Sequence, residues 1–201
     1  MTTYTGIGSR ETPGPALNLM FQIGVRLAHL GWTLRSGGAD GADTAFERGA
    51  SHGGGDMEIF LPWRGFNGRT RGKLGSPEKQ AEAEIIAARF HPAWHRCSQG
   101  ARRLHTRNVF QVLGSDLNSP SACVICWTVG GEGGGGTGQA LRIARHYEVP
   151  ILDLGGLNTC AVPVRWVTDH LRHRFGIEGA HQPTDDDCTH GNTFTCPHCD
   201  C

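Results

Sequence analysis

A glycine-rich run at residues 128–141, TVGGEGGGGTGQAL, contains the residue types best suited to hold an anion. Glycine lets backbone N–H groups approach a ligand closely, and a following helix N-terminus adds partial positive charge. An apolar segment precedes the run and a helical pattern follows it, which is the strand, loop and helix order of nucleotide-binding proteins. A flexible surface loop is the alternative. The candidate phosphate-binding residues in this run are Gly134, Gly135, Gly136 and Thr137.

Two further glycine-containing turns follow predicted strands, GIGSRETP at residues 6–13 and SGGADGAD at residues 36–43. The first offers backbone approach, a hydroxyl and a forked cation to a phosphate. The second offers a tight turn and carboxylates near a helix start. Asp43 there is explained equally well by interaction with the helix dipole and by binding of a ribose hydroxyl. An ordinary turn is the alternative for the first. The candidate ligand-binding residues here are Gly8, Ser9, Arg10, Ser36, Gly37, Gly38, Asp40 and Asp43.

Residues 85–115 contain arginines and histidines but no acidic residue. On a helix predicted over residues 100–113, Arg103 and Arg107 lie one turn apart, with Asn108 and Gln111 close by, and these groups suit a phosphate or a base edge. A solvated basic face without a ligand is the alternative, and it is favoured for the arginines at 102 and 103. The histidines add charge if their surroundings raise their pKa values. They are His91, His95 and His105.

The elements that must position these residues alternate between strand and helix. This alternation predicts an α/β fold, a doubly wound parallel sheet of Rossmann-like type with ligand chemistry at the carboxyl ends of the strands, where the three glycine turns converge. The predicted strands cover residues 3–7, 32–35, 57–61, 122–127 and 149–152. The predicted helices cover residues 15–30, 42–51, 77–90, 100–113, 139–147 and 162–175.

Composition favours one nucleotide-binding domain over residues 1–176 within the chain of 201 residues. The 19 basic and 19 acidic residues balance, so no global field attracts nucleic acid or a membrane. No apolar window is long enough to span a bilayer and no signal peptide is recognised, so we expect a cytoplasmic protein without a membrane partner. Cys123 and Cys126 lie in a predicted buried strand and act as small hydrophobic residues.

Residues 177–201 form a Cys/His-rich tail with a candidate structural zinc site. The CPHC step has the spacing that presents two thiolates to one metal, and zinc binding would supply the folding energy that so short a segment lacks. A disordered tail with free thiols is the alternative, and no redox cofactor is expected. The candidate zinc ligands are Cys188, His190, Cys196 and Cys199.

The turn SGGADGAD resembles the SGGARGID-type turn of the DprA/Smf DNA-processing proteins, which belong to the SLOG superfamily of Rossmann-like proteins. RLHTRN at residues 103–108 and GGGGT at residues 133–137 are similar to the paired MHERK and PGGxGTxxE motifs of the Lonely Guy phosphoribohydrolases, another SLOG branch. The resemblance implies that Arg107 faces the ligand, as the candidate catalytic residue, and that the glycine loop with Thr137 holds a phosphate. Related proteins often pair through their helices, which implies a homo-oligomer.

The chain departs from both families at positions that carry function. Ala140 matches the catalytic glutamate of the phosphoribohydrolases, and Asp40 stands where DprA has an arginine. We therefore expect a protein that binds a nucleotide or an ADP-ribose-like small molecule, as a sensor, carrier or sequestering protein. One alternative is an N-glycosidic nucleotide hydrolase or transferase of Lonely Guy type. The other is a DprA-like module that binds single-stranded DNA through Arg102, Arg103 and Arg107.

Overall fold

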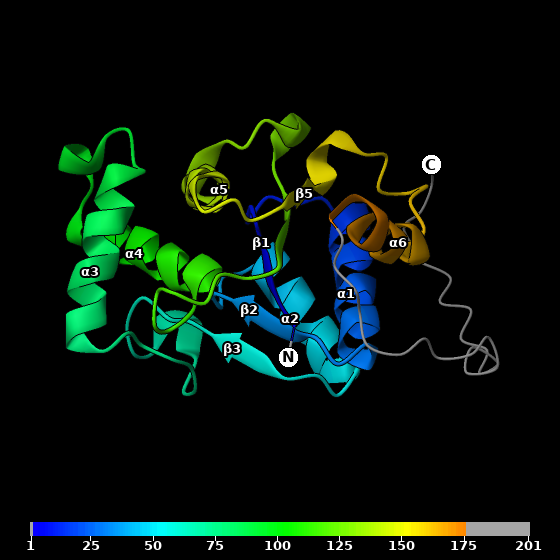
Figure 1. Ribbon diagram of the computed structural model, residues 1–201, viewed down its shortest axis with the longest axis horizontal. Helices are drawn as coiled ribbons and strands as arrows, with labels where there is room; N and C mark the ends of the chain where they lie inside the picture. The colour runs from blue at the N-terminus through cyan, green and yellow to red at the C-terminus, as the bar shows by residue number, and fades with distance from the viewer. Residues whose placement is uncertain (1, 176–201) are drawn as a thin grey trace.

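The computed structural model describes residues 2–175, and a parallel sheet of 5 strands lies at its centre (Figure 1). The strand order is β3-β2-β1-β4-β5. The chain moves outward from β1 in one direction and from β4 in the other, so the loops after these two neighbours diverge and open a crevice at their carboxyl ends. The strands are β1 (Thr3–Gly8), β2 (Thr33–Ser36), β3 (Met57–Ile59), β4 (Cys123–Trp127) and β5 (Ile151–Asp153).

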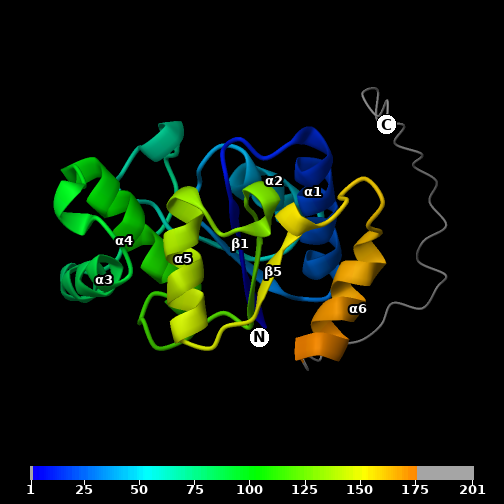
Figure 2. The ribbon, with the colours of Figure 1, turned by 90° about the horizontal axis from the view of Figure 1, so that it is seen from above.

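Helices cover both faces of this sheet (Figure 2). One face packs against α1 (Gly14–His29), α2 (Ala42–His52) and α6 (Val164–Phe175), and the other against α3 (Pro77–Arg89), α4 (Gln99–Leu113) and α5 (Gly135–His146). Short 3-10 turns lie at η1 (Phe66–Gly68), η2 (Trp94–Arg96), η3 (Val129–Gly131) and η4 (Leu154–Gly156). The predicted fold class is confirmed, and every predicted strand and helix overlaps an observed one.

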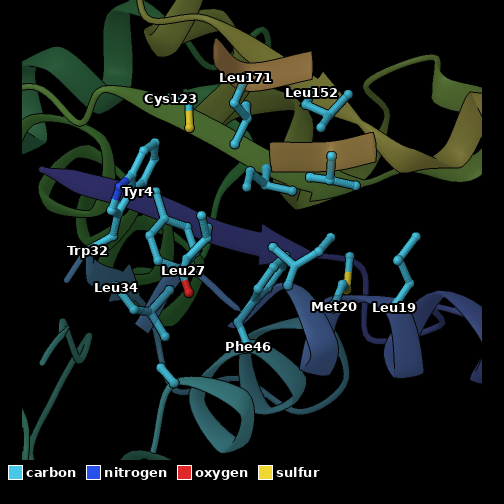
Figure 3. Packing of buried hydrophobic residues seen from close by; sticks show 14 of the residues in the cluster. Tyr4, Leu19, Met20, Leu27, Trp32, Leu34, Phe46, Cys123, Leu152 and Leu171 are labelled. Carbon is cyan, nitrogen blue, oxygen red and sulfur yellow. The ribbon is translucent and has the colours of Figure 1, made fainter. Parts of the chain in front are cut away.

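Each face of the sheet buries its own apolar cluster, because successive side chains of a strand point to opposite sides. Tyr4 of β1 lies in the cluster under α1 and α2, where its ring lies 6.4 Å from that of Trp32 and 6.2 Å from that of Phe46 (Figure 3). Ile7 of the same strand joins the cluster under α4 and α5. A strand apolar on both sides is typical of a parallel sheet between two helical layers.

Two helices begin directly after a capping serine, and a third begins earlier than its sequence predicts. Ser76 and Ser98 cap α3 and α4 by accepting the backbone N–H of Lys79 and Ala101. Helix α5 begins at Gly135, earlier than the predicted start at residue 139. The glycine run therefore enters the first turn of the helix instead of ending before it, because tertiary packing overrides the low helix propensity of glycine.

The cysteines of β4 are buried as predicted. Cys123 and Cys126 are both 0% exposed, and burial raises the pKa of the Cys123 thiol to about 12. Neither is therefore a reactive thiolate at neutral pH. Among residues 2–175, no helix combines the length and the apolar character needed to cross a bilayer. The predicted zinc ligands Cys188, His190, Cys196 and Cys199 lie outside the described residues.

Candidate functional site

A cavity of about 600 Å³ lies at the carboxyl ends of β1 and β4. Loops that are far apart in sequence meet in its wall, namely the turn after β1, the start of α2 and the N-terminus of α5, and α4 closes the remaining side. Most of the residues predicted to bind a ligand are brought together here. They are Gly8, Ser9, Arg10, Asp43, Arg107, Asn108, Gly134, Gly135, Gly136 and Thr137.

Four residues predicted from the second glycine turn do not line this cavity. The Ser36 hydroxyl donates to the Gly6 carbonyl at 2.9 Å, which ties β2 to β1. The amides of Gly37 and Gly38 each donate to a carboxylate of α2 at 3.1 Å. Asp40 is exposed outside the cavity. The turn therefore builds the wall behind the cavity, and its amides are already engaged by the protein itself.

Arg107 is the central cation of the site and is 8% exposed. Its Nη1 donates to the Gly37 carbonyl at 2.6 Å and lies 3.4 Å from the Asp43 carboxylate. Its Nε is buried and has no hydrogen-bond partner within residues 2–175. Burial lowers the pKa of Arg107, while Asp43 opposes that shift. The guanidinium stays charged, because arginine keeps its proton even when partly desolvated, and it has donor capacity that the protein does not use.

Helix α2 carries two buried carboxylates, of which Asp43 lines the cavity and Glu47 does not. Burial raises the pKa of Asp43 against the opposing effect of Arg107, although its oxygen accepts the amides of Gly37 and Ala39. Burial, helped by the neighbouring Asp43, raises the pKa of Glu47 to about 7, although Glu47 is paired with Arg69 at 2.5 Å. Such pairs fix the shape of the wall, since a buried charge is tolerated only with partners.

The N-terminus of α5 faces the cavity without a side-chain cap. Gly134 occupies the cap position and forms no such hydrogen bond, so the first-turn amides at residues 135–137 keep their donors. Asn108 holds this turn in place by donating to the Gly136 carbonyl at 3.3 Å. Thr128 holds the preceding loop, since its hydroxyl accepts the Gly133 amide at 2.9 Å and donates to Asp153. An uncapped helix start beside a cation is suited to an anion.

The wall also contains residues that the sequence analysis did not include among the candidate ligand-binding residues. Thr128, His105 and Gln111 line the cavity, and buried Gln139 lies behind it, where its side chain accepts from Asn108 at 3.0 Å. His105 and Gln111 lie outside the glycine turns, and the packing of α4 against α5 brings them to the cavity. The condition under which His105 would add charge is not met, because burial lowers its pKa.

The arginines predicted to share one basic face are divided by the fold. Arg103 is exposed and lines a separate hollow with Glu84, whereas Arg107 is buried in the main cavity. Arg102 lies over the ring of Trp94, with its guanidinium carbon 5.5 Å from the ring centroid. Of the arginines of α4, Arg107 therefore lines the main cavity, and Arg102 and Arg103 do not.

No protein-family model matches the chain, and no curated protein matches it. Among solved structures, the chain is similar to the structure of the Chlamydomonas rheinhardtii Moco carrier protein, with 18% sequence identity, a TM-score of 0.48 and coverage of 77% of each chain. The assignment of the site rests on the residues that line its cavity.

Proposed function

We propose that this chain binds a small molecule carrying a phosphate, of nucleotide or ADP-ribose type, in the cavity between β1 and β4, without turning it over. The observation that carries the proposal is the meeting of separate anion-binding groups in one wall. Arg10, Arg107 and the uncapped start of α5 all line the same cavity. A guanidinium and free helix amides are complementary to phosphate oxygens in charge and in geometry.

The size of the cavity supports a ligand larger than inorganic phosphate. Its volume of about 600 Å³ lies within the range of about 300–1,000 Å³ typical of small-molecule sites. Apolar residues, Ile7 and Leu104 among them, also line the cavity and suit the base or sugar of a nucleotide. Asn108 and Gln111 provide amide groups that are suited to hydrogen bonds with a base edge or a ribose hydroxyl.

The lack of a carboxylate on α5 supports binding over hydrolysis. Ala140, at the position of the phosphoribohydrolase glutamate, lines the cavity and is 1% exposed. A methyl group there cannot take or give a proton, so the side chain that would activate water is missing from this helix. A sensor, carrier or sequestering protein needs the binding groups alone, and these are the groups found in the wall.

Hydrolysis of an N-glycosidic bond is the second candidate, and one observation favours it. Asp43 lines the cavity and its pKa is raised by burial, and a perturbed carboxyl in a pocket is a common mark of catalysis. Against this, Asp43 already accepts two backbone amides and pairs with Arg107. The exposed Glu11 is the other carboxylate among the lining residues.

DNA binding receives less support from the same residues. Arg107 is buried in the cavity wall, where it cannot track a polynucleotide backbone, and Asp40 is exposed beside the entrance turn of α2. An exposed carboxylate repels DNA phosphates, whereas a single-strand groove requires a continuous cationic path. Loss of single-strand binding with rising salt remains the measurement that would favour this candidate.

The test has two steps and uses the full chain. Native mass spectrometry of the purified protein, before and after denaturation, identifies whatever small molecule is carried and whether it is intact. Thermal-shift titration then compares AMP, ADP and ADP-ribose with adenosine, since a ligand of the folded state raises stability by mass action. We expect an intact phosphate-bearing molecule and shifts that adenosine does not produce. Release of free base would favour the hydrolase, and equal shifts with adenosine would contradict a phosphate site.

A further inference from the structure

A cluster of metal-ligating side chains lies between α3 and α4, beside the cavity. His91 follows the end of α3, Cys97 precedes the start of α4, and His105 stands on α4 itself. One ligand atom from each of these residues lies within 4.8 Å of the other two. All three side chains are half-buried, so that a small ion can reach them. None of the three residues is among the groups assigned above to the phosphate.

We infer that His91, Cys97 and His105 bind one transition-metal ion, with zinc as the best match. Cys97 Sγ lies 3.6 Å from His91 Nδ1, and the two imidazole rings have centroids 4.3 Å apart. A tetrahedral zinc ion with ordinary bond lengths requires sulfur and nitrogen about 3.5 Å apart. Imidazole and thiolate ligands select zinc and its neighbours over magnesium or calcium, which prefer oxygen.

The surroundings of His105 orient its ring as they would for a metal ligand. Its Nδ1 is buried and lacks a hydrogen-bond partner among residues 2–175, whereas buried polar atoms are nearly always paired. The side chain of Gln139 hydrogen-bonds to the same ring, and Gln139 is itself fixed by Asn108 at 3.0 Å. An outer partner that orients a histidine is characteristic of metal sites. A metal on Nδ1 would give that atom the partner it lacks.

The other two ligands need only small adjustments. His91 Nδ1 accepts the Ala93 amide at 3.2 Å, a long contact that a metal bond at this nitrogen would replace. Cys97 must lose its proton to bind a metal, and the positive charge of the bound ion itself stabilises the thiolate. Trp94 lies against both histidines, with ring centroids 6.1 Å from His91 and 6.5 Å from His105, and limits access of water.

Three protein ligands leave the fourth position of a tetrahedral ion for water or for a bound molecule. His105 also lines the main cavity, so the inferred ion lies in or beside its wall. Arg107 and Arg142 act electrostatically on His105. Positive neighbours favour an anionic fourth ligand, such as an oxygen of the molecule in the cavity. The metal site itself does not depend on the identity of that molecule.

The experiment must separate this cluster from the Cys/His-rich tail. In the full chain, Cys188→Ser, Cys196→Ser and Cys199→Ser together form a background variant in which the tail lacks its candidate thiolate ligands. Metal content is measured by elemental analysis, and cobalt(II) is then exchanged in, because a thiolate bound to cobalt gives a charge-transfer band. No nucleotide is added, so failure of the phosphate proposal does not affect the result. We expect one zinc per chain and the thiolate band in the background variant.

Matched variants on that background identify the ligands. We expect Cys97→Ser to remove the thiolate band and to weaken zinc binding by at least about 100-fold, the upper end of what loss of an outer partner costs. His105→Gln is expected to weaken binding similarly. His95→Ala is the control, because His95 lies in η2 between His91 and Cys97 but is exposed and outside the cluster. This variant is expected to keep both metal and band.

Circular dichroism establishes that each variant is folded before its metal content is interpreted. A folded background variant without bound metal overturns the inference, as does a Cys97→Ser variant that keeps the cobalt band. A chain that purifies without metal and whose Cys97 reacts rapidly with iodoacetamide also overturns the inference. That result would indicate a thiol–imidazole pair with His91 instead. If His105→Gln does not fold, the loss of the band in Cys97→Ser decides the question alone.

Discussion

Arg107 Nη1 donates to the Gly37 carbonyl at 2.6 Å, and a Cβ built on Gly37 would lie 1.5 Å from the same nitrogen. The Arg107 side chain therefore requires a glycine at position 37. Arg107 comes from α4, on the face of the sheet opposite α2. The guanidinium occupies the space where any other side chain would begin. This contact joins the second glycine turn to α4 and holds the cation of the cavity against Asp43.

Replacing Gly37 with alanine is expected to displace the Arg107 guanidinium from the cavity wall. The buried ion pair with Asp43 is then broken, so we expect the free energy of unfolding to fall by about 1–3 kcal/mol and nucleotide-induced thermal shifts to disappear. Gly100→Ala is the control, because a Cβ there meets no heavy atom within 4 Å. Wild-type binding by Gly37→Ala would show that Arg107 does not position the ligand.

Arg10→Gln is expected to weaken binding of phosphate-bearing ligands by about 10–100-fold, the cost of one charged hydrogen bond. Arg10 is exposed and lines the cavity, so its loss should leave stability unchanged. Isothermal titration with ADP at two salt concentrations measures the effect. Arg48→Gln removes another exposed arginine, on α2, that does not line the cavity, and it serves as the control. Equal affinities of the two variants would place the phosphate elsewhere.

Thr128→Val is expected to loosen the glycine loop while keeping the shape of the side chain. The hydroxyl that joins the Gly133 amide to Asp153 is lost, so we expect a cost of about 1–3 kcal/mol in unfolding free energy and faster amide exchange at Gly133. Hydrogen exchange and urea unfolding measure these changes. Thr168→Val, which removes a local hydroxyl contact within α6, should leave exchange in the loop as it is.

The buried carboxylate of Glu47 is expected to make stability fall as pH rises. Its folded pKa of about 7 exceeds the ordinary value of 4.5, so the folded state binds more protons than the unfolded state between these pH values. The stabilising contribution is complete below pH 4.5 and is lost as pH rises through about 7. The loss amounts to about 3 kcal/mol at most.

Urea unfolding between about pH 4 and pH 8 tests this dependence, because that range spans both pKa values. Glu47→Gln has no titrating group at this site, so we expect a flatter pH profile, whatever its absolute stability. Glu82→Gln, which removes an exposed carboxylate of α3, should keep the wild-type slope. Identical slopes for wild type and Glu47→Gln would mean that Glu47 titrates normally in the folded protein.

The sequence by itself determined the order and type of the elements. Apolar runs bounded by glycine and proline mark the strands, and helical spacing marks the helices, because both signals are local and repeat over several residues. Alternation of the two then restricts the sheet to a parallel arrangement and directs attention to the turns after its strands. Most of the predicted ligand-binding residues, from Gly8 to Thr137, do line one cavity for this reason.

Only the tertiary structure decided which polar groups in those turns stay available. The amides of Gly37 and Gly38 are engaged by carboxylates of α2, whereas the α5 amides have no capping side chain. Both segments are rich in glycine, and that composition does not reveal which of their amides stay available. Likewise, His91 and His105 meet Cys97 only because α4 folds back after α3. Hydrogen-bond partners and shared ligands depend on distances between distant segments, and local sequence patterns do not contain those distances.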